Sequence, residues 1–192
     1  MKKDSLFHKI CRIVLKSAVA VFLVIVLNLI FIPKYIHENQ DGRITEEFYK
    51  EQLDTDIIFV GSSTVYSGVS PLILWEKYGY TSYDRSNSSQ TIWISYYMIE
   101  DAIKCHKPKL VVLDIGFIKY WDTYAEEPSN RKAIDGMRFS KTKLACIGAA
   151  MDQDEKITDY LFPILRFHSR WKELQPEDFL YDLCYCMCLI YL

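Results

Sequence analysis

The chain is poor in histidine, with four in 192 residues, and none of them follows an aspartate in an Asp-x-x-His motif. Its six cysteines form no Cys-x-x-Cys pair and no Cys/His spacing typical of a zinc site. A disulfide framework is not indicated either. The sequence therefore implies no metal and no cofactor, and it leaves any serine nucleophile without an evident base.

A strong excess of charge of either sign is also missing, because 23 Lys and Arg oppose 25 Asp and Glu. The basic residues are enriched at the start, where residues 1–32 carry five of them against one acid, Asp4. The rest of the chain is mildly acidic, which disfavours nucleic-acid binding by phosphate neutralisation. Half of the residues are hydrophobic, which excludes wholesale disorder.

One long apolar run stands near the start, at residues 13–32, and only Lys16, Ser17 and Asn28 interrupt it. Twenty helical residues span about 30 Å, the hydrocarbon thickness of a bilayer. The basic residues at its amino-terminal end predict a cytoplasmic N-terminus and an extracytoplasmic domain, held by an uncleaved signal anchor in the cell membrane. A cleavable signal peptide is the first alternative, although it would have a shorter apolar core and small residues after it. A buried core helix is the second alternative.

The apolar run divides the chain into four parts. We predict a cytoplasmic basic segment at 1–12, a transmembrane anchor at 13–32, a stalk at 33–53 and a partial α/β domain at 54–192.

Short apolar runs alternate with helical patterns in the first half of the outer domain. Strands are predicted at 57–60, 81–84 and 110–115, and helices at 71–78 and 91–105. Strand, helix, strand, helix, strand is typical of a three-layer α/β fold with a parallel sheet. A polar loop at 122–131 and helices at 141–151 and 157–166 are predicted to follow.

The last 13 residues form an apolar tail, 180–192, that contains Cys184, Cys186 and Cys188. Such a tail predicts either a buried strand or a fragment of a longer domain, because termini are usually polar and exposed. A strand would place the three thiols on one face, with no role that the sequence indicates.

The first predicted strand runs directly into Gly61, Ser62, Ser63 and Thr64. A serine in such a turn, at the carboxyl edge of a parallel strand, is well placed as an exposed nucleophile. The hydroxyls could equally cap the local backbone. A phosphate-binding loop is disfavoured, because no Gly-Lys-Ser/Thr follows.

Residues 59–64 and 83–91 resemble the first and second blocks of the SGNH, or GDSL-type, hydrolases and their membrane-anchored envelope relatives. The resemblance implies flavodoxin-like (SGNH) winding of the sheet, incomplete here, with Ser63 as the nucleophile. It also implies that the backbone N–H groups of Ser63 and Ser89 form the oxyanion hole. Ser89 replaces a glycine of the family, so this role requires that the backbone there does not need a positive φ. The third block, at 113–118, lacks the asparagine often found in the family.

Four other residues are candidates for lining the site: Ser62, Asn87, Asp114 and His168. Asp114 could belong to the site or merely cap the turn after the third strand. His168 and the neighbouring Arg166, Arg170 and Trp171 could bind an anionic or sugar substrate, or form a solvated helix end.

The family resemblance implies an envelope esterase or O-acyltransferase that acts on acyl esters of cell-envelope glycans through a seryl ester. The missing Asp-x-x-His predicts that the parent activity is lost. The alternative is a non-catalytic envelope protein, either a pseudoenzyme or a partner of a membrane acyl-transfer system. A nucleotide-binding module is a third alternative.

Overall fold

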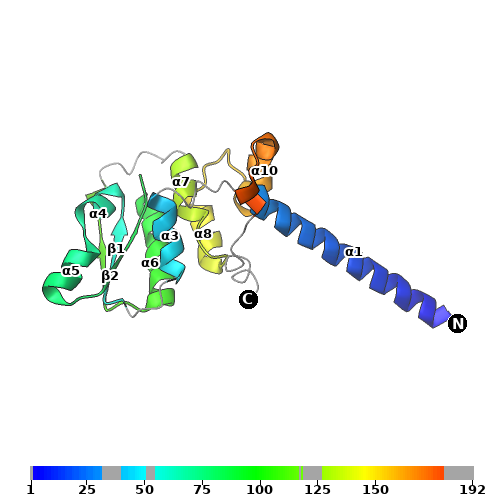
Figure 1. Cartoon of the computed structure of the whole chain (residues 1–192), viewed down its shortest axis with the longest axis horizontal. Helices are drawn as coiled ribbons and strands as arrows, with labels where there is room; N and C mark the ends of the chain where they lie inside the picture. The colour runs from blue at the N-terminus through cyan, green and yellow to red at the C-terminus, as the bar shows by residue number, and fades with distance from the viewer. Residues whose placement is uncertain (1, 32–39, 51–54, 117, 119–126, 180–192) are drawn as a thin grey trace. The chain divides into compact units, whose positions relative to one another are not determined.

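A computed structural model describes residues 2–31, 40–50, 55–116, 118 and 127–179 of the chain (Figure 1). The described residues form two compact units, 2–31 with 161–179 and 40–160. The apolar tail at 180–192, with its three cysteines, lies outside the described residues.

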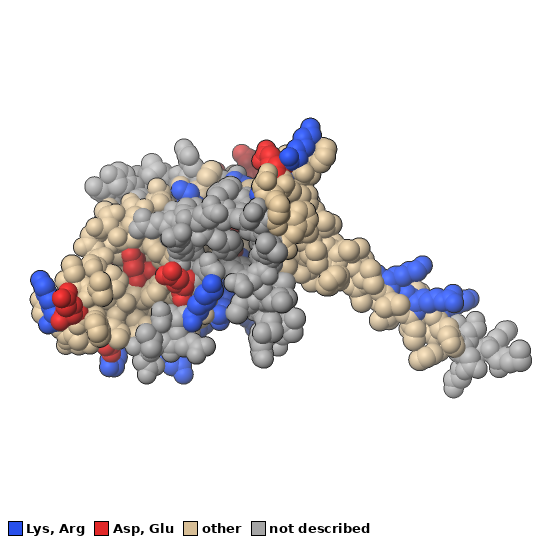
Figure 2. All heavy atoms as spheres, in the orientation of Figure 1, with Lys and Arg blue, Asp and Glu red and all other residues tan. Residues whose placement is uncertain are grey.

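Helix α1 (Lys2–Phe31) carries the predicted membrane span. Its segment Leu6–Phe31 is 26 residues long and contains an 18-residue window with a mean hydropathy of 2.7, long and apolar enough to cross a membrane. Figure 2 shows basic side chains near the amino-terminal end of this helix and an uncharged surface along its middle. A helix of spanning length is therefore confirmed, and by length and composition a signal sequence near the N-terminus meets the same criteria.

The unit that contains α1 also includes α10 (Pro163–Phe167) and two short 3-10 helices, η2 (His168–Lys172) and η3 (Pro176–Phe179). The Asn28 side chain accepts a hydrogen bond from the backbone N–H of Ile164 at 3.0 Å. Arg170 donates to the carbonyl of Phe31 at 2.7 Å and pairs with Asp178 at 3.1 Å. Polar side chains therefore bind the end of α1 to the segment after residue 161.

The second unit is built on a three-stranded parallel sheet in the order β2-β1-β3. Its strands are β1 (Ile57–Gly61), β2 (Ser82–Ser86) and β3 (Leu110–Leu113). The predicted parallel α/β sheet is confirmed, and β2 extends two residues further than its sequence pattern predicted. Gly61 pairs with Ser86, which aligns the carboxyl ends of β1 and β2.

Helices cover the sheet on both sides in this unit. Figure 1 shows α4 (Ser63–Gly68) and α5 (Pro71–Tyr78) on one side of the strands, and α3 (Gln40–Lys50) and α6 (Ile92–His106) on the other. Ile58 and Val60 are fully buried within the sheet. Beyond β3 come α7 (Glu127–Ile134), α8 (Lys141–Ala150) and α9 (Ile157–Leu161).

The helix boundaries follow local capping chemistry where the sequence supplies it. Ser70 caps α5 through its side chain, Pro71 occupies the first turn, and Gly79 ends the helix with a φ of 73°. Thr91 caps α6 in the same way. The first of these helices was predicted from its capping signals, and the second from apolar residues at helical spacing.

The third strand ends at Leu113, two residues before its predicted end. Two predicted elements beyond the sheet also differ from the structure. Residues 127–131, predicted as part of a polar loop, belong to α7. The helix predicted at 157–166 is divided into α9 and α10, with Phe162 between them. Pro163 lacks an N–H and begins a new helix rather than continuing the first one.

A glycine is required at position 61, the end of β1, because the side chains of Asp114 and Val65 lie too close to leave room for a Cβ atom. A Cβ atom built there would lie 2.5 Å from the Cβ of Asp114 and 2.6 Å from Cγ2 of Val65. Any side chain at this position would therefore displace either the residue after β3 or the first turn of α4.

Candidate functional site

The serine turn lies at the point where the winding of the sheet reverses. From β1 the chain passes through α4 and α5 to β2 on one side, and then through α6 to β3 on the other side. The carboxyl ends of β1 and β3 therefore flank the topological switch point, where open α/β sheets bind their ligands. Gly61, Ser62 and Ser63 are at the first of these ends, and Asp114 follows the second.

Ser62 is buried and acts as the N-cap of α4. It is 1% exposed, and its Oγ accepts a hydrogen bond from the backbone N–H of Thr64 at 3.4 Å. The sequence left open whether hydroxyls of this turn cap the backbone, and the structure shows that Ser62 does so.

Asp114 follows β3 and lies against the serine turn. One carboxylate oxygen, Oδ2, accepts hydrogen bonds from Ser62 Oγ at 3.2 Å and from the Thr64 hydroxyl. The other oxygen, Oδ1, accepts from the backbone N–H of Gly116 at 2.8 Å. The sequence left open whether Asp114 caps the turn after β3 or belongs to the candidate site. In the structure it caps that turn and also contacts the serine turn.

Hydrogen bonding keeps the Asp114 carboxyl ionised. The Thr64 hydroxyl and then the Gly116 N–H hold the pKa of Asp114 below its usual range. At neutral pH the residue is therefore a carboxylate that accepts hydrogen bonds, and a weaker base than an ordinary aspartate.

Ser63 begins α4 and is half-buried. Its two neighbours in the sequence, Ser62 and Thr64, both donate to Asp114. The Ser63 hydroxyl has no hydrogen-bond partner among the described residues. Of the three consecutive hydroxyls in the turn, Ser63 therefore carries the one that is available to a ligand.

The loop after β2 is held by buried amides. Asn87 donates from its backbone to the carbonyl of Gly61 at 3.3 Å and from its side chain to Gln90 Oε1 at 2.9 Å. Gln90 in turn donates to Ser95 Oγ at 3.0 Å. Asn87 is fully buried, so it holds the loop beside the end of β1 rather than presenting its side chain at the surface.

Ser89 lies in the same loop with a φ of 54°, in the left-handed region. The adjacent Ser88 hydroxyl lies 3.0 Å from the hydroxyl of Tyr66 on α4. A glycine adopts such a backbone readily, whereas a serine does so at a cost. An oxyanion role for Ser89 was expected only if its backbone could avoid a positive φ. The structure has a positive φ there, so Ser89 can offer its N–H only from a strained backbone.

His106 and His168 each contact a backbone carbonyl rather than a residue of the serine turn. His106 ends α6, at the edge of the sheet where β3 begins, and its Nε2 lies 2.7 Å from the carbonyl of Phe48. Among the described residues of this unit it is the one histidine, and it occupies the edge opposite Ser63. His168 belongs to the other unit, where its exposed ring contacts the carbonyl of Leu165 at 2.9 Å.

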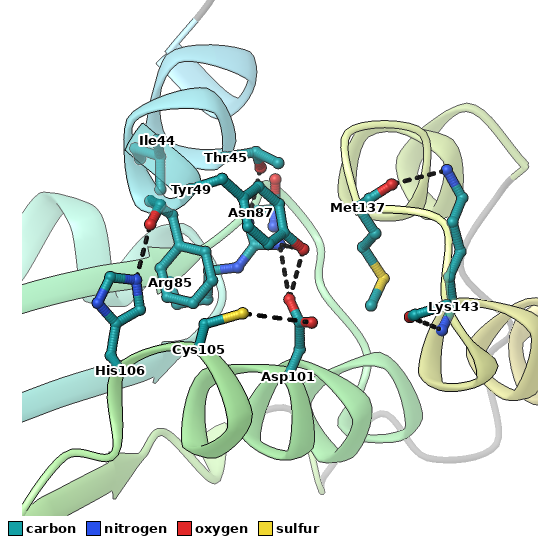
Figure 3. A network of polar contacts seen from close by, with 12 residues as sticks. Ile44, Thr45, Tyr49, Arg85, Asn87, Asp101, Cys105, His106, Met137 and Lys143 are labelled. Atoms are coloured by element: carbon teal, nitrogen blue, oxygen red, sulfur yellow. Dashed lines mark hydrogen bonds and ion pairs between the residues drawn. The ribbon is translucent and has the colours of Figure 1, made fainter. Parts of the chain in front are cut away.

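A buried cluster around Arg85 was not predicted from the sequence (Figure 3). The Arg85 side chain is fully buried, donates to Thr45 Oγ1 at 2.8 Å and lies over the ring of Phe48 at 4.6 Å. Its guanidinium lies 3.9 Å from the carboxylate of Asp101, which also accepts from the Tyr49 hydroxyl. The cluster joins β2 to α3 and α6. The one feature of the sequence that could have indicated it is an arginine that directly follows a predicted strand.

The thiol and phenol of this cluster are kept protonated. Burial raises the pKa of Cys105 to about 11 and raises the pKa of Tyr49 well above its ordinary value. Cys105 Sγ contacts Asp101 Oδ1 at 3.9 Å. Neither group is therefore a nucleophile at neutral pH, and the cluster serves packing.

Figure 3 also shows Lys143, which binds the segment after α7. Its Nζ donates to the carbonyls of Asp135 at 3.1 Å and Met137 at 3.0 Å. Burial lowers the pKa of Lys143. Within the described ranges, no group of three or more His, Cys, Asp and Glu side chains could hold a metal ion.

Comparisons with protein-family models, with curated proteins and with solved structures find no match. The SGNH resemblance of residues 59–64 and 83–91 therefore stays a prediction.

Proposed function

We propose that this chain is a membrane-anchored extracytoplasmic protein of SGNH-like type that binds acyl esters of cell-envelope glycans at the switch point of its sheet. The observation that carries the proposal is the free, half-buried hydroxyl of Ser63 between two hydroxyls that bind Asp114. The strand order β2-β1-β3 supports it, because a flavodoxin-like sheet has this order in its first three strands.

In this proposal Ser63 Oγ attacks the ester carbonyl, the bond from that carbonyl carbon to the glycan oxygen breaks, the serine proton passes through water to the departing glycan hydroxyl, and a seryl ester remains. The backbone N–H of Ser63 and, from its strained left-handed backbone, that of Ser89 would hold the oxyanion. Ser62 and Asn87 support the turn and the loop on either side.

Turnover by such a site is slow, because the described residues place no evident general base beside Ser63. His106 is at the opposite edge of the sheet, and the carboxylate of Asp114 is engaged by Ser62 and Thr64 rather than by Ser63. Sites that lose a triad member keep a rate about 10³–10⁴-fold above the uncatalysed one, from oxyanion donors and binding. We expect binding of acylated glycan with residual hydrolysis only.

The test uses full-length protein in detergent with O-acetylated cell-wall glycan fragments. Binding is measured by calorimetry and acetate release by an enzymatic assay. We expect saturable binding in both the wild type and Ser63→Ala, and slow acetate release that Ser63→Ala abolishes. Absence of binding by correctly folded wild type would refute the proposal.

The second candidate is a non-catalytic envelope protein, a pseudoenzyme or a partner of a membrane acyl-transfer system. The position of His106 favours this second candidate, because the ring lies at the opposite edge of the sheet from Ser63. In the same experiment, binding of acylated glycan without acetate release above the Ser63→Ala background would identify this candidate.

A further inference from the structure

We infer that Asp114 is a positioning residue for Ser63, because its carboxylate engages the hydroxyls on both sides of Ser63 and so leaves that hydroxyl free. The inference deepens the proposed function and rests on it only in taking Ser63 as the reacting group. The sequence left open whether Asp114 merely caps a turn.

The position of Asp114 is fixed by the backbone of the sheet. Its N–H donates to the carbonyl of Val60 at 2.8 Å, which continues the pairing of β1 with β3 beyond Leu113. Gly61 has no Cβ, and a Cβ there would lie 2.5 Å from that of Asp114. The carboxylate can therefore lie directly against the end of β1.

The carboxylate then determines the partners of the hydroxyls in the turn. Ser62 Oγ and the Thr64 hydroxyl both donate to Oδ2. Hydroxyl groups in a turn otherwise bond to their nearest polar neighbours. Ser62 Oγ and Thr64 Oγ1 also lie 2.7 Å from each other. Without Asp114, one of these hydroxyls can donate to the other, and the second loses its acceptor and is free to turn toward Ser63 and lower its nucleophilicity.

A cysteine at position 63 reports on this effect without needing a general base, since a thiolate is itself nucleophilic. We would measure alkylation of Ser63→Cys in the full-length protein by iodoacetamide, at a pH where the thiol is fully ionised. The plateau rate then reports the position and hydrogen bonding of the sulfur rather than its ionisation. Mass spectrometry of the peptide that contains residue 63 separates this site from the native cysteines.

The test adds Asp114→Ala to Ser63→Cys. Because Asp114→Ala removes the acceptor of both hydroxyls, a freed hydroxyl would bond to the thiolate, and we expect the plateau rate to fall about tenfold. Asp56→Ala is the matched control. Asp56 also has a lowered pKa and accepts bonds from a threonine, Thr81, but it lies at the other end of the sheet. This control should leave the rate within about twofold of the parent.

The inference is overturned if the rate with Asp114→Ala stays within about twofold of the parent or rises, or if Asp56→Ala lowers it equally. An equal loss in the control would mean that general damage to the sheet explains the effect. The proposed function fails separately, through absent binding of acylated glycan, whatever the alkylation rates show.

Discussion

Ser89 has the left-handed backbone that glycine favours, with a φ of 54°. We predict that Ser89→Gly stabilises the protein by about 1 kcal/mol, because the strain of a side chain in this region is relieved. Lys107 has a φ of 46°, so Lys107→Gly is a matched comparison that should act in the same direction. Urea denaturation measures both, and a lower free energy of unfolding for Ser89→Gly would contradict the prediction.

Asp84 on β2 is partly buried, and burial raises its pKa from 3.8 to about 6. Between these values the folded protein keeps a proton that the unfolded chain has released. Stability therefore falls as pH rises through this window and stays low above it. We predict that Asp84→Asn stabilises by on the order of 1–2 kcal/mol at pH 7.5 and has little effect near pH 4.

Denaturation of wild type and Asp84→Asn at both pH values measures this effect. An equal change at the two values would show that the charge of Asp84 is not the cause.

Single residues of the candidate site were named from the sequence, but their contacts were not. Ser63, Ser62 and Asp114 were candidates because each follows a strand that the sequence marks clearly. The bonds from Ser62 and Thr64 to Asp114 join positions about 50 residues apart. Such bonds depend on the register of β1 and β3, and nearly continuous apolar runs, which do not alternate, specify a register only weakly.

At the scale of elements, Arg85 holds β2 against α3 and α6. We predict that Arg85→Met destabilises the protein by about 3 kcal/mol, because Asp101 would remain buried without its cation. Lys109 is a contrasting control. It pairs with Asp56 at 2.6 Å but is 83% exposed, so Lys109→Met should cost at most about 1 kcal/mol.

Thermal or urea unfolding of the two variants measures the difference. If Arg85→Met costs no more than Lys109→Met, the cluster contributes nothing beyond a surface ion pair.

Elements with strong local signals were predicted well, and those that depend on packing were not. Helix α5 follows from Ser70 and Gly79, whose capping chemistry is local, and α6 from apolar residues at helical spacing. The residues at the start of α7 are polar, and its buried residues include Asn130 and Arg131 beside Ala133 and Ile134, so its apolar pattern is short. Asn130 donates to the carbonyl of Ala150 at 3.0 Å, a tertiary contact that the sequence does not indicate.

At the scale of the whole molecule, the sheet is covered unevenly by the described residues. Ile58 and Val60 of β1 are fully buried, whereas Leu110 and Val112 of β3 are 51% and 39% exposed. Val112 pairs with Phe59 and so lies on the face opposite Val60. Parallel sheets normally have both faces covered, so β3 presents an unusually apolar surface.

The apolar helix α1 defines the expected location of the protein. We predict that deleting residues 1–32 releases the chain from membranes into the soluble fraction, because the remaining described helices lack a comparable span. Carbonate extraction followed by immunoblotting measures this. A deletion variant that stays in the membrane pellet would contradict the assignment of the anchor.

Among the described residues, the Ser63 hydroxyl is free of partners and has no general base beside it. The most direct test is the rate at which a fluorophosphonate labels the full-length protein, with and without added imidazole as an external base. We predict slow labelling that rises with imidazole concentration in the wild type and is absent in Ser63→Ala, with Ser62→Ala retaining it. Fast labelling without imidazole, or labelling that survives Ser63→Ala, would contradict the account.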